Sequence, residues 1–294
     1  VIPVKLLEEN RILINKYQES FGGKKISFTH IIGWAVAKAV NKNPSMNNAY
    51  TIIDGKPHLI IRDEVNLGIA IDIEKKDGSR TLIVPNIKRA NKIRFTEFVE
   101  RFDELVSKAR KGQIDPGDFI GTTLTLTNPG TVGTVASNPR LMIGQGAIIA
   151  TGAIQFPAAY HAMSASTIST LGISKEMGIT STYDHRIIQG AESGLYLKTI
   201  HEFILGKDNF YEEIFNDLKI PLKPAIWETD YQPGAFSERT NTDEIEKQAR
   251  VLQLINMYRV RGHLNSRLDP LGSKITYHPE LDPATYKLTI WDLD

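Results

Sequence analysis

Residues 28–42 constrain the fold more than any other segment, because a helix there would carry apolar side chains on most of its sides. These side chains are Ile31, Ile32, Trp34, Ala35, Val36, Ala39 and Val40. Ser27 can cap the helix, and Pro44 ends it, since the residue before a proline disfavours helical backbone. Such a helix needs neighbours on nearly every side. It therefore predicts a domain large enough to bury it deeply.

Strands and further helices follow in mixed order to about residue 220. Strands are predicted over residues 1–7, 50–53, 58–61, 66–73, 81–85, 122–127, 147–154 and 179–183, and helices over residues 10–19, 96–111 and 193–205. Leu124 and Leu126 alternate with threonines, which predicts a half-buried strand. We therefore expect an α/β domain whose helices cover a mixed or mostly antiparallel sheet.

Composition narrows the classes of function. The 294 residues carry a formal net charge of +1, so bulk charge gives no reason to expect a nucleic-acid or membrane partner. The absence of cysteine rules out disulfides, thiolate metal sites and a cysteine nucleophile, and it fits a cytoplasmic protein. No run approaches the roughly 18 apolar residues of a membrane helix, and no signal-peptide pattern opens the chain. Because the first residue is Val1, we expect an internal piece of a longer protein.

The composition changes after residue 220. Residues 221–241 contain Pro221, Pro224 and Pro233 among many polar residues, which is typical of a linker. Asn241 can then cap a helix, with Glu244 reaching back to it. The apolar stripe of that helix consists of Ile245, Ala249, Leu252 and Ile255, widened by Val251, Leu254 and Tyr258. We therefore divide the chain into a large domain over residues 1–220, a linker over 221–241 and a helical segment over 242–294.

Two strand ends carry the candidate catalytic residues. His185 follows the strand predicted over residues 179–183, and Thr127 ends the strand over residues 122–127. An unperturbed imidazole titrates near ~6.5, so a well-placed histidine can deprotonate a thiol. A hydroxyl donor can stabilise the oxyanion of a tetrahedral intermediate, which is typically worth ~3 kcal/mol. Taken alone, a strand histidine or threonine is more often structural, so the pattern leaves both interpretations open.

The other candidate features favour structural roles. We expect His30, His58, His161, His201, His263 and His278 to be structural, and no His, Asp or Glu cluster has metal-site spacing, so we predict no metal. Residues 144–146, Gly-Gln-Gly, lack the third glycine and the following helix of a phosphate loop. The basic run over residues 88–94 is typical of a solvated face, and binding of a phosphate-bearing cofactor is the alternative.

The two strand-end segments resemble the catalytic domain of the 2-oxo-acid dehydrogenase acyltransferases, and specifically the succinyltransferases. The family signature Asp-His-Arg-x-x-Asp-Gly is matched at Asp184, His185, Arg186 and Gly190. The family's Thr-Ile-Thr-Asn-type segment is matched by residues 125–128. The resemblance implies a chloramphenicol-acetyltransferase-like two-layer domain with a mixed sheet, followed here by the helical start of a second domain.

The same resemblance implies roles for three residues. His185 would act as general base, and Thr127 would hydrogen-bond the tetrahedral intermediate. Gln189 stands where the family has Asp or Asn, so it would assist with amide hydrogen bonds only. In the family the base and the hydroxyl come from neighbouring subunits of a trimer, and coenzyme A and lipoyl-lysine enter from opposite ends of a channel. We therefore expect a homotrimeric core.

The whole chain is similar to a narrower group, the actinobacterial-type fused 2-oxoglutarate decarboxylase/dehydrogenases. The residues that carry this similarity include 128–134, 251–256 and 261–263, together with Leu268-Asp269-Pro270-Leu271-Gly272. It implies transfer of a succinyl group from a lipoyl thioester to coenzyme A in the tricarboxylic acid cycle. Thiamine diphosphate and magnesium are expected only in a downstream domain beyond Asp294.

No lipoyl-domain sequence is present, so we expect a lipoyl-bearing acyltransferase protein as a partner, with dihydrolipoyl dehydrogenase in the wider complex. The alternative is a trimeric scaffold for the decarboxylase domain in which acyl transfer is weak or lost.

Overall fold

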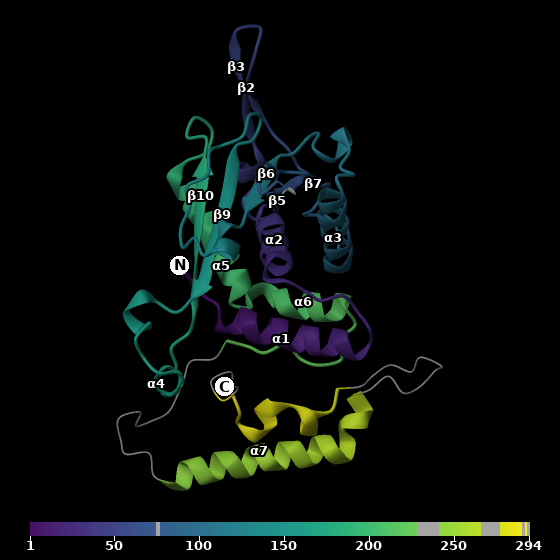
Figure 1. Ribbon diagram of the computed structural model, residues 1–294, viewed down its shortest axis with the longest axis vertical. Coiled ribbons are helices and arrows are strands. Elements are labelled where there is room, and N and C mark those ends of the chain that lie inside the picture. The colour runs from purple at the N-terminus through teal and green to yellow at the C-terminus, as the bar shows by residue number, and fades with distance from the viewer. Residues whose placement is uncertain (75–76, 228–240, 266–276, 290–291, 293–294) are drawn as a thin grey trace.

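A six-stranded mixed sheet forms the centre of the molecule, and its strands run in the order β1, β10, β9, β8, β4 and β7 (Figure 1). The computed structural model describes residues 1–74, 77–227, 241–265, 277–289 and 292. The strands are β1 Ile2–Pro3, β4 Leu67–Ile69, β7 Asn86–Ile87, β8 Leu124–Thr127, β9 Ala147–Gln155 and β10 Glu176–Tyr183. β8 is parallel to β9 and β4, whereas the other pairs are antiparallel, so the predicted mixed sheet is confirmed.

Several helices pack on this sheet, and α2 is the most deeply buried of the described helices. The helices are α1 Lys5–Ser20, α2 Phe28–Ala39, α3 Phe95–Lys111, α4 Ala165–Thr170, α5 Gly190–Ile204, α6 Phe210–Asp217 and α7 Asn241–Arg261. α2 packs against both α3 and α5, and Trp34 is fully buried between them and their neighbours. The Ser27 hydroxyl accepts a hydrogen bond from the His30 amide at 3.2 Å, as expected for the N-cap. The prediction of a deeply buried, Ser27-capped helix is confirmed.

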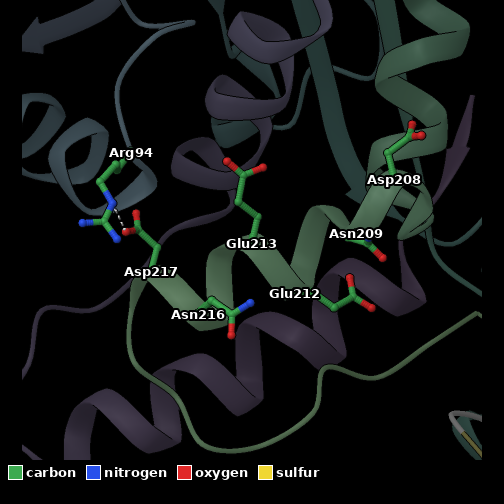
Figure 2. Close-up of a pocket in the computed structure, with 7 residues that line it drawn as sticks. All are labelled: Arg94, Asp208, Asn209, Glu212, Glu213, Asn216 and Asp217. Atoms are coloured by element: carbon green, nitrogen blue, oxygen red, sulfur yellow. Dashed lines mark ion pairs between the residues drawn. The ribbon is translucent and has the colours of Figure 1, made fainter.

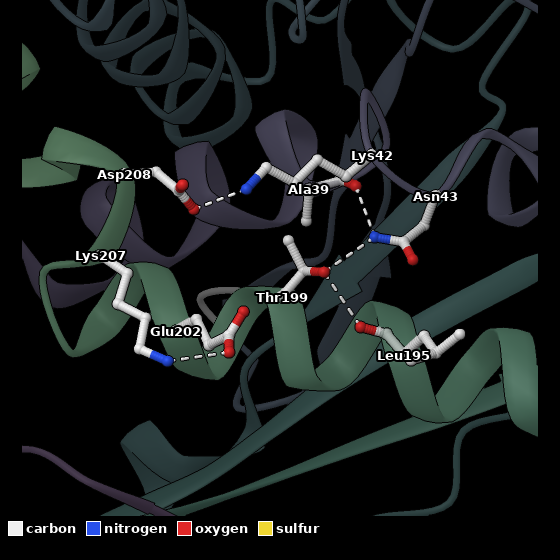
Figure 3. A network of polar contacts seen from close by, with 8 residues as sticks. All are labelled: Ala39, Lys42, Asn43, Leu195, Thr199, Glu202, Lys207 and Asp208. Atoms are coloured by element: carbon white, nitrogen blue, oxygen red, sulfur yellow. Dashed lines mark hydrogen bonds and ion pairs between the residues drawn. The ribbon is translucent and has the colours of Figure 1, made fainter.

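Polar contacts fix α5 to the end of α2 (Figure 3). The Asn43 amide donates to the Ala39 carbonyl at 3.1 Å and to the Thr199 hydroxyl at 2.9 Å. The Thr199 hydroxyl in turn donates to the Leu195 carbonyl at 3.0 Å. Nearby, the Lys42 ammonium pairs with the Asp208 carboxylate at 2.6 Å. These contacts hold the helix that begins next to the candidate catalytic histidine.

Two hairpins extend from the central sheet. The first joins β2 (Ala49–Ile53) to β3 (Lys56–Ile60) through Asp54 and Gly55, both with positive φ, which suits a tight two-residue turn. This hairpin projects from the body of the molecule, and every residue of β3 is exposed (Figure 1). The second pairs β5 (Ile71–Glu74) with β6 (Arg80–Ile83). The first hairpin agrees with the strands predicted over residues 50–53 and 58–61.

The N-terminal prediction was wrong in one respect. A strand was expected over residues 1–7, but β1 ends at Pro3 and α1 begins at Lys5. The helical pattern is set by buried residues at helical spacing, namely Leu6, Leu7, Asn10 and Ile14. Lys5 also pairs with Glu9 one helical turn away. The apolar run that suggested a strand is therefore the first turn of a buried helix face.

Two strand predictions also need correction. The strand expected over residues 66–73 is interrupted at Ala70, and its halves, β4 and β5, belong to different sheets. β8 is not half-buried, because Thr123 and Thr125 are only 5% and 1% exposed. The Thr125 hydroxyl donates to the Gln145 side-chain oxygen at 2.8 Å, which removes the cost of burying it. β8 is thus a central strand covered on both faces.

The segment after residue 220 begins against α1. The Asn10 side chain exchanges hydrogen bonds with the Ala225 backbone, at 3.1 Å to the carbonyl and 2.8 Å from the amide. Asn10 is fully buried, so the first residues of the expected linker pack on the large domain. The start of α7 matches the helix expected after Asn241, and its apolar side chains Leu252 and Ile255 are 60% and 41% exposed. Across the described ranges, no helix combines the length and apolarity needed to cross a membrane.

Candidate active site

His185 lies in the turn that follows β10, two residues beyond Tyr183. The turn is held by backbone hydrogen bonds on both sides of the histidine. The Asp184 amide donates to the Gly146 carbonyl at 2.8 Å, and the Ile188 amide donates to the Asp184 carbonyl at 3.0 Å. The imidazole is exposed, and its ring lies 5.6 Å from the ring of Tyr183. In the part of the chain that the structure describes, neither ring nitrogen has a hydrogen-bond partner, so both are available to a substrate.

The residues on either side of His185 are tied together by an ion pair. The Arg186 guanidinium donates to the Asp184 carboxylate through Nε at 2.8 Å and Nη2 at 2.5 Å, and the Arg186 amide adds a third hydrogen bond at 3.1 Å. These hydrogen bonds lower the pKa of Asp184 and raise the pKa of Arg186. Asp184 and Arg186 therefore stay charged near neutral pH and brace the turn from which the imidazole projects.

Thr127 is the last residue of β8, as predicted from the sequence. It lies opposite Ala150 of β9 and is half-buried. Among the described residues its hydroxyl makes no hydrogen bond, so it can donate to a bound group. The next residue, Asn128, donates through its amide to the Thr29 hydroxyl on α2 at 3.0 Å. The end of β8 is thus anchored to the buried helix while the Thr127 hydroxyl stays free.

His185 and Thr127 do not meet within one chain. Tyr183 lies opposite Ala147 of β9, whereas Thr127 lies opposite Ala150 of the same strand. Three residue positions, roughly 10 Å, separate these two levels along the strands. His185 lies two residues farther on, beyond Tyr183, and β9 itself lies between β10 and β8. Within one chain the histidine and the threonine therefore lie on different strands and at different levels of the sheet.

Gln189 is the N-cap residue of α5, with extended backbone at φ −86° and ψ 154°. The Glu192 carboxylate accepts a hydrogen bond from the backbone amide of Gln189 at 2.7 Å. Asp, Asn, Ser and Thr are the residues that cap a helix best, because their short side chains reach the first free amides. Glutamine has a longer arm, so although Gln189 and Glu192 form a capping box, Gln189 is a weaker cap than Asp or Asn would be.

Comparison with known proteins identifies the family to which this domain is similar. Residues 2–210 match the family described as 2-oxoacid dehydrogenases acyltransferase (catalytic domain). The match covers the central sheet, the His185 turn and the end of β8. The chain belongs to this family.

Curated relatives of this acyltransferase domain are much longer than the chain. It is 49% identical over 297 residues to the "Multifunctional 2-oxoglutarate metabolism enzyme" of Mycobacterium sp. (strain JLS), covering 100% of this chain and 23% of that protein. The protein of the same name from Mycolicibacterium vanbaalenii is 48% identical, again covering 100% of this chain and 23% of the relative. The chain thus spans less than a quarter of the length of these relatives.

Solved structures agree on the fold of the acyltransferase domain. A probable dihydrolipoamide acetyltransferase from Listeria monocytogenes 4b F2365 is similar with a TM-score of 0.57 and 25% identity, covering 71% of this chain and 83% of that one. The dihydrolipoamide acetyltransferase of Azotobacter vinelandii gives a TM-score of 0.56 at 22% identity, covering 69% and 78% of the two chains. The predicted acyltransferase fold is confirmed.

One residue next to the turn was not identified from the sequence. The Arg186 guanidinium packs over the ring of Tyr50, 3.6 Å from the ring centroid. Tyr50 lies in β2, at the root of the exposed hairpin. It precedes Arg186 by 136 residues, and no spacing rule connects the two positions.

The other histidines of the acyltransferase domain occupy structural positions. His30 is 3% exposed, its Nδ1 accepts from the Ser27 amide at 3.2 Å, and its Nε2 lies 3.2 Å from the Asp103 carboxylate. Burial lowers the pKa of His30, although Asp103 opposes the shift. Burial also lowers the pKa of His201. His161 bonds the Phe156 carbonyl at 2.8 Å, and among the described residues no group of three or more His, Asp or Glu could hold a metal ion.

One cavity of the described part lies away from the candidate catalytic residues (Figure 2). It has a volume of about 580 Å³ and is lined by Arg94, Asp208, Asn209, Glu212, Glu213, Asn216 and Asp217. Arg94 and Asp217 point toward one another and form an ion pair at 2.8 Å. Asp217 also accepts from the Thr96 amide at 2.9 Å, so it stabilises the start of α3. This cavity therefore has a structural explanation.

The basic run is partly engaged within the fold. The Lys88 ammonium donates to the Ile120 carbonyl, and the Lys88 carbonyl accepts from the Arg101 guanidinium at 3.0 Å. Arg94, at the other end of the run, is paired with Asp217. These contacts favour a structural role for the run over binding of a phosphate-bearing cofactor.

Proposed function

We propose that this domain transfers a succinyl group from a dihydrolipoyl thioester to coenzyme A, as the acyltransferase part of a fused 2-oxoglutarate dehydrogenase/decarboxylase. The observation that carries the proposal is the His185 turn, where an imidazole with two free ring nitrogens stands exposed on a braced strand end. The names of the curated relatives support 2-oxoglutarate as the metabolic context and hence a succinyl group as the acyl group.

The chemistry follows from the two free side chains. His185 takes the proton from the coenzyme A thiol, and the resulting thiolate attacks the thioester carbonyl. The tetrahedral intermediate carries an oxyanion, to which the Thr127 hydroxyl donates a hydrogen bond. When the intermediate collapses, the carbon–sulfur bond to the dihydrolipoyl group breaks. The departing thiolate then recovers the proton from the imidazolium, which returns His185 to its starting state.

The separation of His185 from Thr127 supports a site shared by two copies of the chain. A histidine of one subunit and a threonine of its neighbour form a complete site in each interface of a trimer. A homotrimeric core is therefore part of the proposal. Gln189 assists from the start of α5 through its amide.

The remaining components of the proposal concern the longer protein. Residues 1–220 form the acyltransferase domain, 221–241 a linker and 242–294 the helical start of the decarboxylase domain. Thiamine diphosphate and magnesium belong to the part of that domain beyond Asp294. The lipoyl group comes from a lipoyl-bearing acyltransferase protein, and dihydrolipoyl dehydrogenase reoxidises it in the wider complex. We place this assembly in the cytoplasm.

Gln189 favours a second candidate function. Because the family signature has Asp or Asn at this position, the domain would serve mainly as a trimeric scaffold for the decarboxylase, with weak or lost acyl transfer. A scaffold has no need of coenzyme A, so measured binding of coenzyme A separates the two functions.

Kinetic analysis of two variants tests the proposed chemistry. In the full-length protein, His185→Ala is expected to lower kcat for transfer from succinyl-dihydrolipoamide to coenzyme A by roughly 10²- to 10⁴-fold, because it removes the base. Thr127→Val is expected to lower kcat by roughly 10²- to 10³-fold, because it removes the oxyanion donor.

His58→Ala serves as the matched control, since His58 is exposed on β3 and, among the described residues, its ring bonds only the nearby Lys56 carbonyl. It should leave kcat unchanged. Retained transfer in His185→Ala, with the trimer intact by sedimentation, would remove His185 from the base role and leave the scaffold function.

A further inference from the structure

We propose that Tyr50 is a positioning residue for His185 and acts through the Arg186 guanidinium. This inference rests on the proposed role of His185 as the base. His185 has no side-chain hydrogen bond of its own in the described part of the chain, so its place is set by the turn that carries it. The question is therefore which contacts hold that turn.

Arg186 braces the turn from one side. Its guanidinium spans His185 and donates two hydrogen bonds to the Asp184 carboxylate. A guanidinium–carboxylate pair of this kind fixes the relative orientation of both side chains. The Asp184 side chain is 11% exposed but the Arg186 side chain is 62% exposed even with Tyr50 in place, so the ion pair is open to solvent on the arginine side and is weakened by salt.

Tyr50 covers the open face of that guanidinium. The guanidinium carbon lies over the Tyr50 ring, 3.6 Å from the ring centroid. An aromatic face attracts a cation and at the same time shields it from water. The hydrogen bonds between Arg186 and Asp184 are therefore protected on one side by a residue from another element.

The root of the β2–β3 hairpin is fixed to the same backbone that holds the His185 turn. The Asn48 carbonyl packs so closely on Gly146 that a Cβ at that position would lie 1.9 Å from it. The Gly146 carbonyl accepts the Asp184 amide, and the Arg62 guanidinium donates to the Gly144 carbonyl at 3.0 Å. Tyr50 therefore reaches Arg186 from a hairpin whose two ends, at Asn48 and Arg62, contact residues 144–146 next to the His185 turn.

Only glycine permits this approach at residue 146, which explains why the Gly-Gln-Gly sequence is present without a phosphate loop. Asn48, Gly146 and Asp184 form one continuous backbone contact. The side chains of Tyr50 and Arg186 add a second contact between the hairpin root and the His185 turn. The hairpin root thus holds the turn at two points.

Two substitutions of Tyr50 in the full-length protein test the proposal. Tyr50→Leu removes the aromatic face and is expected to lower kcat for acyl transfer roughly tenfold to a hundredfold, because a small misplacement of a catalytic group has effects of that size. KM for coenzyme A should change by less than about twofold, since the site loses orientation and not contacts. Tyr50→Phe keeps the face and should retain near wild-type kcat.

A double-mutant cycle adds a second test of the same idea. If Tyr50 acts through the guanidinium, Tyr50→Leu should cost little more in kcat when Arg186→Gln is already present. Additive losses would contradict the proposal. Ile53→Ala is the matched control, because Ile53 lies on the same strand, is 52% exposed and is at the far end of the hairpin from Tyr50.

Hydrogen exchange followed by mass spectrometry makes the result independent of activity. The Asp184, Ile187 and Ile188 amides are all hydrogen-bonded in the turn, so the peptide over residues 183–190 should exchange faster in Tyr50→Leu and not in Tyr50→Phe. Unchanged exchange together with unchanged kcat would overturn the proposal. If Tyr50→Leu exchanges faster but the wild type shows no acyl transfer, the role of Tyr50 in bracing the turn is upheld. The proposed function is then the part that is rejected.

Discussion

Gln189 has two positions of interest at once, at the start of a helix and close to the proposed catalytic base. It stands at the N-cap of α5, where a short acceptor would satisfy a free amide and a negative charge would face the positive end of the helix. It also lies four residues after His185. A substitution here therefore affects stability and catalysis for different physical reasons.

Gln189→Asp is expected to raise the free energy of unfolding by about 0.5–1 kcal/mol, through the restored cap and the charge at the helix N-terminus. Urea denaturation measures this change. Gln189→Ala should leave stability within about 0.5 kcal/mol of the wild type, because the present side chain is a poor cap. A destabilised Gln189→Asp variant would show that Glu192, which already bonds the Gln189 amide, repels the new carboxylate.

Sequence reasoning located His185 and Thr127 correctly at strand ends, since β10 ends at Tyr183 and β8 ends at Thr127. Their roles remain proposals. It did not find Tyr50, because the contact with Arg186 joins two positions 136 residues apart and leaves no local pattern. Such contacts depend on how two surface elements meet, which spacing along the chain does not encode.

At the scale of elements, α2 was the best-predicted part of the fold. Its apolar residues leave no exposed side, and Ser27 marks its start. By contrast, β8 was predicted to be half-buried because leucine and threonine alternate. The threonines are buried as well, since Thr125 finds a partner in Gln145, an acceptor that no local rule identifies. Short elements such as β7, α4 and α6 were not predicted because few residues carry their periodicity.

The start of α2 should also make stability depend on pH. Burial lowers the pKa of His30 in the folded state, so the unfolded chain binds a proton more readily below about 6.5. The stability that neutral His30 contributes is therefore complete above that pH and is lost as the pH falls toward the folded-state pKa. His30→Gln keeps a capping-box residue at this position and removes the titration.

Thermal unfolding at pH 7.5 and 5.5 checks this expectation. The decrease in Tm on acidification should be smaller for His30→Gln than for the wild type. His58→Gln is the control, because His58 is exposed on the hairpin. Equal decreases in the wild type and His30→Gln would mean that other groups cause the pH dependence.

At the scale of the whole molecule, one chain carries the two proposed catalytic residues, His185 and Thr127, on different strands and apart from one another. The register of β10, β9 and β8 separates the His185 turn from Thr127. The strand ends were predictable from periodicity in outline, but the sheet order and this separation were not, because they depend on the pairing, direction and register of strands far apart in sequence. This separation is the reason for our proposal that a second copy of the chain completes the site.

Subunit mixing tests this claim most directly. His185→Ala and Thr127→Ala proteins should each be nearly inactive. Dissociated together in equal amounts and reassembled, they should recover about a quarter of wild-type activity, because each mixed trimer regains one interface with both residues intact. Each variant reassembled alone is the control. Mixed trimers, verified by mass spectrometry, that stay as inactive as the separate variants would contradict a site shared between chains.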